Sequence, residues 1–438
     1  NYLERLEELL QKTRQILEEF PNSPQKGLLL YESGIAAQKL HKHAEATPLL
    51  RAAMQYFVGE KENYIESGKG LLNSLQAIEK WAEAAFVSRE IAAVLPKDEQ
   101  PFFLLLAVRF DYQLEKWSDV KAGSEKILQD WQELEEIKKE ALQLNYSANL
   151  ALEEYQAAAK NLEILKLLTD KKERAEISLR LANIYLYLNE LQKADLLLEE
   201  ELQTAQFSEE SSFDMLVLHY RIQMELEKEL EAMRSAEMIL QADNTKQAKL
   251  SADFWLSIGE LFYNKKRSSE AEKALLVALK LEENDEKKIR IVKLLGELML
   301  LQNRFVEMEQ LFSKKITEVA NKNSDADFFS MQAELFFQLN KYELAFAAIN
   351  RCFSDEASGS IRAVTRARWV MAKMLFEQEK DAENALSYCT KAFVLADDEI
   401  YSARALQLAV EIYLAINKED EAKASWNELK NRYPQAAA

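Results

Sequence analysis

The sequence predicts an all-α solenoid of about eleven helix-turn-helix repeats, and two observations lead to that fold class. The 438 residues include only nine Gly and six Pro, which is too little turn-forming material for extensive β-structure. Bulky residues at predicted turns also recur at a nearly constant spacing. A fixed period of this kind indicates one helical unit repeated along the chain rather than two or three separate globular cores.

The repeat is visible when the chain is divided at the turn between the two helices of each unit. The turn marks are spaced almost evenly along the whole chain, as their residue numbers show. They are His43, Trp81, Trp117, Tyr155, Leu191, Leu230, Ser268, Phe305, Tyr342, Ala382 and Glu419.

Apolar and small residues occur at helical spacing on both sides of each turn. The clearest unit has Trp255, Ile258, Gly259 and Phe262 before the turn, and Ala271, Leu275 and Ala278 after it. Small residues such as Gly259 and Ala271 allow two helices to approach closely, while Trp255 and Phe262 fill the groove between units. This combination resembles the tetratricopeptide repeat (TPR), and the resemblance implies a right-handed superhelix with the first helices lining a concave groove.

The TPR-like pattern covers almost the whole chain with uneven strength. It recurs in three later units as Val292, Leu295, Gly296 and Met299, then Ala333, Phe336, Tyr342 and Ala345, then Trp369, Phe376, Ala385 and Ala392. Further matches in the N-terminal half are Gly34, Ala46, Ala53, Trp81, Ala84, Pro96, Trp117, Ile127, Ala182, Tyr185 and Ala194. The unit near 214–251 is poor, with Arg221 and Met233 where small residues are expected, and it predicts a break between two sub-arrays.

Several element boundaries follow from punctuation residues. Pro21, Pro96 and Pro434 are each expected to end a second helix, because proline cannot donate an N–H to continue it. Residues 1–26 are predicted to form an orphan second helix of a truncated upstream repeat, and 27–438 are predicted to form the continuous solenoid. The period exceeds the length of about 34 residues that is usual for TPR units. Segments 242–247, 321–325 and 355–360 are therefore predicted to be loops between units.

Composition argues against several classes of partner. The net charge is −18, with acidic residues scattered throughout, so we expect no nucleic-acid binding. No apolar run approaches the length of about 18 residues that a membrane span needs. Cys352 and Cys389 lie in helical patterns and are interpreted as small core residues, so no disulfide framework is expected.

The sequence contains no pattern that indicates catalysis. His41 and His43 flank a predicted turn far from His219, and are interpreted as solvated turn residues rather than zinc ligands. The string Ser67-Gly68-Lys69-Gly70 lacks the context of a phosphate-binding loop and is predicted to start a helix. We therefore predict no enzyme activity, no cofactor and no metal.

Candidate partner-binding residues are those expected to face the groove from the first helices. They are Asn73, Arg109, Asn183, Glu260, Glu297, Glu334 and Glu411. The four glutamates form a column of like charge, which predicts either a basic guest segment, extended or helical, or internal neutralisation by Arg290 or Lys293. TPR domains that clamp a C-terminal carboxylate use a Lys–Asn pair like Lys69 and Asn73.

The rest of that carboxylate clamp is missing from this chain. Leu106, Glu140 and Leu144 stand where the clamp requires Asn, Lys and Arg, so no such clamp is expected.

The resemblance implies a protein–protein interaction scaffold or adaptor in a multiprotein assembly, with other proteins as partners. The alternative is a peptide-binding regulatory or sensor module of a larger protein. The endings Phe20-Pro21-Asn22-Ser23-Pro24 and Arg432-Tyr433-Pro434-Gln435 are similar to those of bacterial TPR proteins of the periplasm and cell envelope, which slightly favours that location over the cytoplasm. Uncovered apolar surface on the orphan helix also predicts homo-oligomerisation through the solenoid ends.

Overall fold

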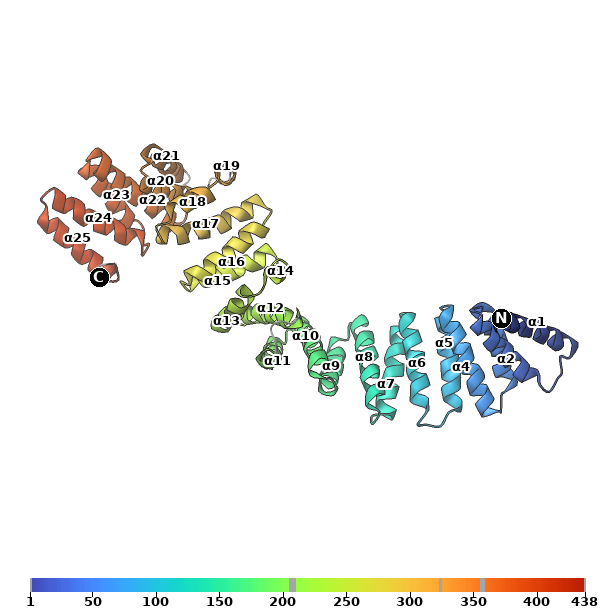
Figure 1. Cartoon of the computed structure of the whole chain (residues 1–438). Helices are drawn as coiled ribbons and strands as arrows, with labels where there is room; N and C mark the ends of the chain where they lie inside the picture. Colours follow the sequence, from blue (N-terminus) through green and yellow to red (C-terminus); the bar gives the residue numbers. More distant parts are fainter. Residues whose placement is uncertain (1, 205–209, 323–324, 355–358, 437–438) are drawn as a thin grey trace. The chain divides into compact units, whose positions relative to one another are not determined.

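The computed structural model describes residues 2–204, 210–322, 325–354 and 359–436, and its regular elements within those ranges are all helices (Figure 1). In this described part, eleven helical hairpins follow one another along the chain, together with three additional helices, α1, α14 and α19. The all-α repeat fold predicted from the spacing is therefore confirmed. The chain divides into two compact units, residues 1–228 and 229–438.

Unit 1 holds α1 and the first hairpins of the array. Its helices are α1 (Tyr2–Glu19), α2 (Lys26–Lys39), α3 (His43–Tyr56), α4 (Lys61–Ala77), α5 (Trp81–Val94), α6 (Gln100–Gln113), α7 (Trp117–Asp130), α8 (Glu135–Ala151), α9 (Tyr155–Leu168), α10 (Lys171–Tyr187), α11 (Leu191–Thr204) and α12 (Glu210–Glu225).

Unit 2 begins with the second helix of the sixth hairpin. Its helices are α13 (Glu229–Leu240), α14 (Asn244–Gln247), α15 (Ala252–Asn264), α16 (Ser268–Leu281), α17 (Asp285–Leu301), α18 (Phe305–Leu311), α19 (Lys314–Lys322), α20 (Ala326–Gln338), α21 (Tyr342–Ser354), α22 (Ile361–Met374) with the π-helix η2 (Leu375–Glu379), α23 (Ala382–Val394), α24 (Tyr401–Ala415) and α25 (Glu419–Arg432). The division between the units falls inside the weak repeat at 214–251.

One turn geometry closes the first helix of all eleven hairpins. A residue with φ between 54° and 61° lies two positions before each second helix. In ten hairpins the next residue donates its N–H to the carbonyl five residues earlier, as Lys80 does to Leu75 at 2.9 Å. This is the Schellman cap, which satisfies carbonyls at the end of the helix. Ten of the eleven turn marks are the first residue of a second helix, and α13 begins one residue before Leu230.

The left-handed position of that turn is never glycine. Its occupants are His41, Glu79, Glu115, Glu153, Asn189, Glu227, Lys266, Asn303, Asn340, Lys380 and Asn417. A left-handed conformation costs an L-residue about 1–2 kcal/mol. Because the cap recurs without glycine, hairpin packing and the two capping hydrogen bonds must outweigh that cost at every turn.

Close approach of the two helices depends on the small residues predicted for it. A Cβ on Gly259 would lie 2.6 Å from Cδ2 of Leu275, and one on Gly296 would lie 3.1 Å from the ring of Phe312. All seven residues of the clearest predicted unit, from Trp255 to Ala278, are buried. Within each unit, neighbouring hairpins share buried apolar clusters, such as the one that includes Leu10, Leu50 and Phe110 in unit 1.

Three local predictions were wrong. The Ser67–Gly70 string lies in the middle of α4, where Gly68 makes room for Ile91 of α5, rather than at a helix start. Residues 244–247 form the short helix α14, because Asp243 accepts N–H bonds from Thr245 and Lys246 as an N-cap. In the 321–325 segment, residues 321–322 belong to α19; residues 323–324 and 355–358 lie outside the described ranges.

The longest spacing between successive turn marks, from Tyr342 to Ala382, contains a helix with a distorted C-terminal end. α22 continues into the π-helix η2, and the N–H of Asp381 bonds to the carbonyl of Leu375, six residues earlier instead of five. One additional residue is thereby inserted between the first helix and its turn. Arg366 of α22 therefore occupies the same structural position in its hairpin as Arg404 of α24 does in the last one, although one more residue separates it from the turn.

First and second helices form different faces of each unit. First helices of neighbouring hairpins pack together, as α6 with α8, α10 with α12, α20 with α22 and α22 with α24. Neighbouring second helices are joined by long charged side chains, for example Arg51 of α3 and Glu83 of α5 at 2.7 Å. The side of each unit formed by the first helices is here called the inner face.

Candidate protein-binding surface

In unit 1 the predicted residues of the first helices are exposed on the inner face. Asn73 of α4 and Asn183 of α10 are exposed, and Asn183 donates from Nδ2 to the carbonyl of Leu179 in its own helix at 2.8 Å. Arg109 of α6 is also exposed and pairs through two nitrogens with the carboxylate of Glu140 on α8. This face presents amides and a neutralised ion pair.

The Lys–Asn pair that resembles part of a carboxylate clamp is engaged locally. The Nζ of Lys69 lies 2.7 Å from Oε1 of Glu66, one turn earlier on α4. Glu140, where the clamp would need a basic residue, is held by Arg109. The inner face of unit 1 therefore carries no cluster of free cations at these positions.

In unit 2 three of the four glutamates of the predicted column, Glu260, Glu297 and Glu334, pair with arginines of the chain itself. Glu260 of α15 pairs with Arg290 of α17 at 2.5 Å, as one of the alternatives from the sequence predicts. Lys293 instead pairs with Asp325 at 2.9 Å. Glu411 of α24 is exposed.

Glu297 and Glu334 belong to a cluster centred on Arg366 of α22, and Arg366 is only 1% exposed. Its Nη2 donates to Glu297 of α17, and its Nη1 donates to the hydroxyl of Ser330 on α20 at 3.2 Å. Its Nε lies 3.3 Å from Oε2 of Glu334 but without hydrogen-bond alignment, so that contact is electrostatic. The guanidinium also lies 4.7 Å from the ring centre of Tyr401.

Two residues of α24 complete the cluster around Glu334, which is only 3% exposed. The hydroxyl of Tyr401 donates to its Oε2 at 2.6 Å, and Nη1 of Arg404 donates to its Oε1 at 2.9 Å. The Arg404 guanidinium lies 5.1 Å from the Tyr401 ring centre and 5.2 Å from that of Trp369. Two arginines thus balance two glutamates among aromatic rings, as buried charges require.

Burial and pairing act against each other on these groups. Burial lowers the pKa of Arg366, but Tyr401, Glu297 and Glu334 raise it above its ordinary value. Burial, together with Glu334 and Glu297, raises the pKa of Tyr401 although Arg366 lowers it. Arg366 is therefore charged and Tyr401 is a neutral hydrogen-bond donor.

The cluster joins first helices that are not neighbours along the array. Glu297 and Arg366 belong to hairpins two apart, as do Glu334 and Arg404. Tyr263 of α15 and Arg362 of α22 interact electrostatically across three hairpins. Burial, followed by the charge of Glu297, raises the pKa of Tyr263, although Arg362 lowers it. The inner face of unit 2 is therefore filled by its own side chains along α17, α20, α22 and α24.

These contacts correspond to the alternative of internal neutralisation, through Arg290 as predicted, and through Arg366 and Arg404 instead of Lys293. Glu334 is buried, Glu297 is largely covered and Glu260 is paired, so of the column only Glu411 is an exposed carboxylate. The column spacing had indicated which positions face inward. It held no signal for Arg366 and Arg404, which occupy inward positions on the next two first helices.

Other side chains considered from the sequence lie away from this surface. His41 adopts the left-handed turn conformation and His43 begins α3, so both flank the turn as predicted. His219 is buried and contacts Asp195 at 2.9 Å, and burial lowers its pKa despite Asp195. Cys352 and Cys389 are buried thiols, and the Cys352 thiol lies 3.9 Å from the carbonyl oxygen of Ala363.

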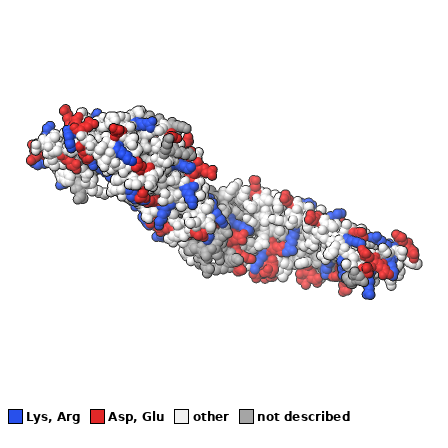
Figure 2. Space-filling model, turned by 45° about the horizontal axis from the view of Figure 1, so that its top comes forward, with Lys and Arg blue, Asp and Glu red and all other residues white. Residues whose placement is uncertain are grey.

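Two features are absent from the described part of the chain. Within it, no three His, Cys, Asp or Glu residues are grouped so as to hold a metal ion. No described helix has both the length and the apolar character needed to cross a bilayer. On the face drawn in Figure 2, acidic and basic side chains are interspersed.

Comparisons with known proteins give similarities to solved helical-repeat structures. The Naa15/Naa10 complex bound to HypK-THB matches 98% of the chain at 14% identity and a TM-score of 0.42, and the chain spans 64% of that protein's length. The match to the APC/C hetero-tetramer Cut9–Hcn1 covers 98% of this chain and 91% of the matched chain, at 11% identity and a TM-score of 0.39. The match to a tetratricopeptide repeat protein from Parabacteroides merdae covers 62% of this chain and 98% of the matched chain, at 17% identity and a TM-score of 0.31.

The chain is thus similar to TPR structures, while its fold rests on its own eleven described hairpins. No family model matches the sequence, and no curated protein matches it.

Proposed function

We propose that this chain is a protein–protein interaction scaffold or adaptor that takes partner segments on the inner face of unit 1. The observation that carries the proposal is the contrast between the two inner faces. In unit 2 the Arg366 cluster occupies that face, whereas in unit 1 Asn73, Arg109 and Asn183 are exposed along it. Stacked hairpins with an accessible inner face favour recognition of an extended or helical segment.

Several finer points remain predictions for this chain. They are membership of a multiprotein assembly, a bacterial envelope location, and self-association through the solenoid ends. Light scattering over a range of protein concentrations tests the last of these, because an end-to-end contact raises the average mass as concentration rises.

The test of the scaffold role compares matched surface variants as bait. The full chain, the inner-face variant Asn73→Arg/Asn183→Arg and the outer control Gln129→Arg/Gln192→Arg are used to capture partners from native extract. Gln129 and Gln192 are exposed amides on the second helices α7 and α11, so the control carries the same chemical change. Partners identified by mass spectrometry should be lost with the inner-face variant and kept with the control. Equal capture by all three baits contradicts the proposal.

A further inference from the structure

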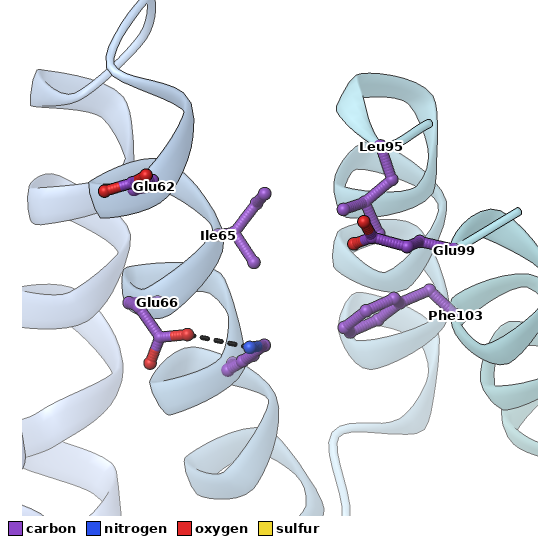
Figure 3. Close-up of a pocket in the computed structure, with 7 residues that line it drawn as sticks. Glu62, Ile65, Glu66, Leu95, Glu99 and Phe103 are labelled. Carbon is purple, nitrogen blue, oxygen red and sulfur yellow. Dashed lines mark hydrogen bonds and ion pairs between the residues drawn. The ribbon is translucent and has the colours of Figure 1, made fainter. Parts of the chain in front are cut away.

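A pocket lies at the edge of the inner face of unit 1, between the beginnings of α4 and α6 (Figure 3). Its volume is about 370 Å³, within the range of ~300–1,000 Å³ in which proteins hold small ligand groups. Seven residues line it: Glu62, Ile65, Glu66, Lys69, Leu95, Glu99 and Phe103. A pocket of this size accommodates one long side chain of a partner.

The pocket has an apolar lining with excess negative charge. Leu95 and Phe103 are nearly buried and present carbon surface, and Ile65 adds more from α4. Lys69 pairs with Glu66, which leaves the carboxylates of Glu62 and Glu99 without an ion pair or hydrogen bond among the described residues. Figure 3 shows Glu62 on one wall and Glu99 on the other.

We propose that this pocket binds a basic side chain, arginine in preference to lysine, from an extended partner segment. The inference rests on the proposed function and names the chemistry that one part of the surface recognises. An aliphatic stem fits against Ile65, Leu95 and Phe103, while the cationic head is attracted by the excess negative charge that Glu62, Glu66 and Glu99 give the rim of the pocket. A guanidinium additionally stacks on an aromatic face, which an ammonium does less well.

The same chain contains an internal precedent for that arrangement. In unit 2 the guanidinium of Arg366 lies between the carboxylates of Glu297 and Glu334 and above the Tyr401 ring. Arg366 and Arg404 occupy a position that Glu66 and Phe102 occupy on α4 and α6 of unit 1. Unit 1 therefore lacks the internal arginines of unit 2 at this position. Its Glu66 is paired with Lys69, and the unpaired carboxylates nearby are those of Glu62 and Glu99.

The experiment is a peptide selection against the intact chain. A phage-displayed library of random twelve-residue peptides is selected on the full protein, and one recovered peptide is labelled with fluorescein. Its affinity is measured by fluorescence anisotropy for the wild type and for Glu62→Gln/Glu99→Gln. The control Glu19→Gln/Glu133→Gln removes the same charge from two glutamates of unit 1 that are exposed and unpaired among the described residues.

Recovered peptides should be enriched in Arg, and Arg→Lys and Arg→Ala versions of the labelled peptide should bind progressively more weakly. Loss of two partly exposed charge pairs should weaken binding about fivefold in Glu62→Gln/Glu99→Gln, with less than twofold change in the control. Lys69→Gln should strengthen binding about twofold, because it frees Glu66 and removes the competing cation. Damage to the fold in Lys69→Gln would not increase the affinity for the peptide.

The negative outcomes separate the pocket from the wider proposal. Peptides without enrichment in basic residues, or equal affinities for the pocket variant and the control, overturn the pocket while leaving inner-face binding intact. A selection that returns no binding peptide also overturns it. Failure of the scaffold role itself is read from the bait experiment, where the inner-face variant would capture the same partners as the wild type.

Discussion

Removing the Arg366 side chain should destabilise unit 2 by an amount that depends on pH. Arg366→Met keeps much of the apolar volume but deletes the cation that contacts Glu297 and Glu334. Glu297 then loses the arginine that donates to it, while Glu334 keeps its pair with Arg404. Breaking a buried ion pair from one side typically costs about 3–5 kcal/mol.

The cluster can escape part of that cost by taking up a proton. An ordinary Glu carboxyl has a pKa of about 4.3, so neutralising one costs about 3.7 kcal/mol at pH 7 but about 1 kcal/mol at pH 5. The folded variant then holds a proton that its unfolded chain does not. Its stability therefore falls as pH rises above 4.3, and the deficit relative to wild type is smaller at pH 5 than at pH 7.

Hydrogen exchange measured by mass spectrometry suits this test, because a chain with two units need not unfold in a single step. Peptides from α20, α22 and α24 should exchange about 500-fold faster than wild type at pH 7, and about fivefold faster at pH 5, after correction for intrinsic rates. The matched control is Arg290→Met, whose arginine pairs with Glu260 but is 64% exposed. Its effect should stay within about 1 kcal/mol.

Two results would refute this account of the cluster. One is the same acceleration at both pH values, which would mean that lost packing rather than uncompensated charge destabilises the variant. The other concerns Arg366→Met/Glu297→Gln, in which one arginine again balances one glutamate. That double variant should recover most of the protection at pH 7, and no recovery would show that the cluster is not coupled as its geometry indicates.

Three further predictions test the hairpin itself. Gly259→Ala should destabilise unit 2 by about 1–3 kcal/mol, because its Cβ would lie 2.6 Å from Leu275; urea titration followed by exchange of α15 and α16 peptides measures the loss. Glu115→Gly should stabilise unit 1 by about 0.5–1 kcal/mol by relieving the left-handed conformation, while Glu115→Ala should change the urea midpoint little. Burial raises the pKa of Cys389 to about 12, so neither it nor buried Cys352 should react with a disulfide reagent at pH 8 until guanidinium unfolds the chain.

The hairpins could be predicted from the sequence because their signal is repeated and local. Each second helix starts near a mark set by apolar spacing, and eleven copies at one period outweigh the weakness of any single copy. The turns themselves gave a poorer signal. Glu, Asn, Lys and His occupy the left-handed position, so the glycine that usually reveals a Schellman cap is absent from all eleven.

The break between α18 and α19 is a feature that the repeat pattern could not predict. α18 ends at Leu311 and α19 begins at Lys314, although no Pro or Gly interrupts the sequence there. Between them Phe312 stacks on Phe328 of α20 with ring centres 4.6 Å apart. The break accompanies packing between hairpins, whereas helical periodicity within one hairpin records only local preference.

The state of the inner face was likewise beyond the reach of the repeat pattern. Spacing identifies positions that face inward, but contact between Glu297 and Arg366 depends on the rotation accumulated over two hairpins. Small differences in that rotation decide whether inward side chains meet each other or solvent. The sequence therefore yielded the column of glutamates and the pairing of Arg290, but it did not reveal Arg366 and Arg404.

One position of the repeat, on the inner face of the first helix, connects these observations. Arg366, displaced in sequence by the π-helix, and Arg404 both occupy it and supply the cations that fill the inner face of unit 2. Glu66 and Phe102 occupy it in unit 1, where the neighbouring surface is an acidic pocket instead of a closed cluster. At the inward position where unit 2 has Glu297 and Glu334, unit 1 has Asn73 and Arg109, so the two faces differ in both members of the charge pairs. This difference supports the proposal that partners bind to unit 1.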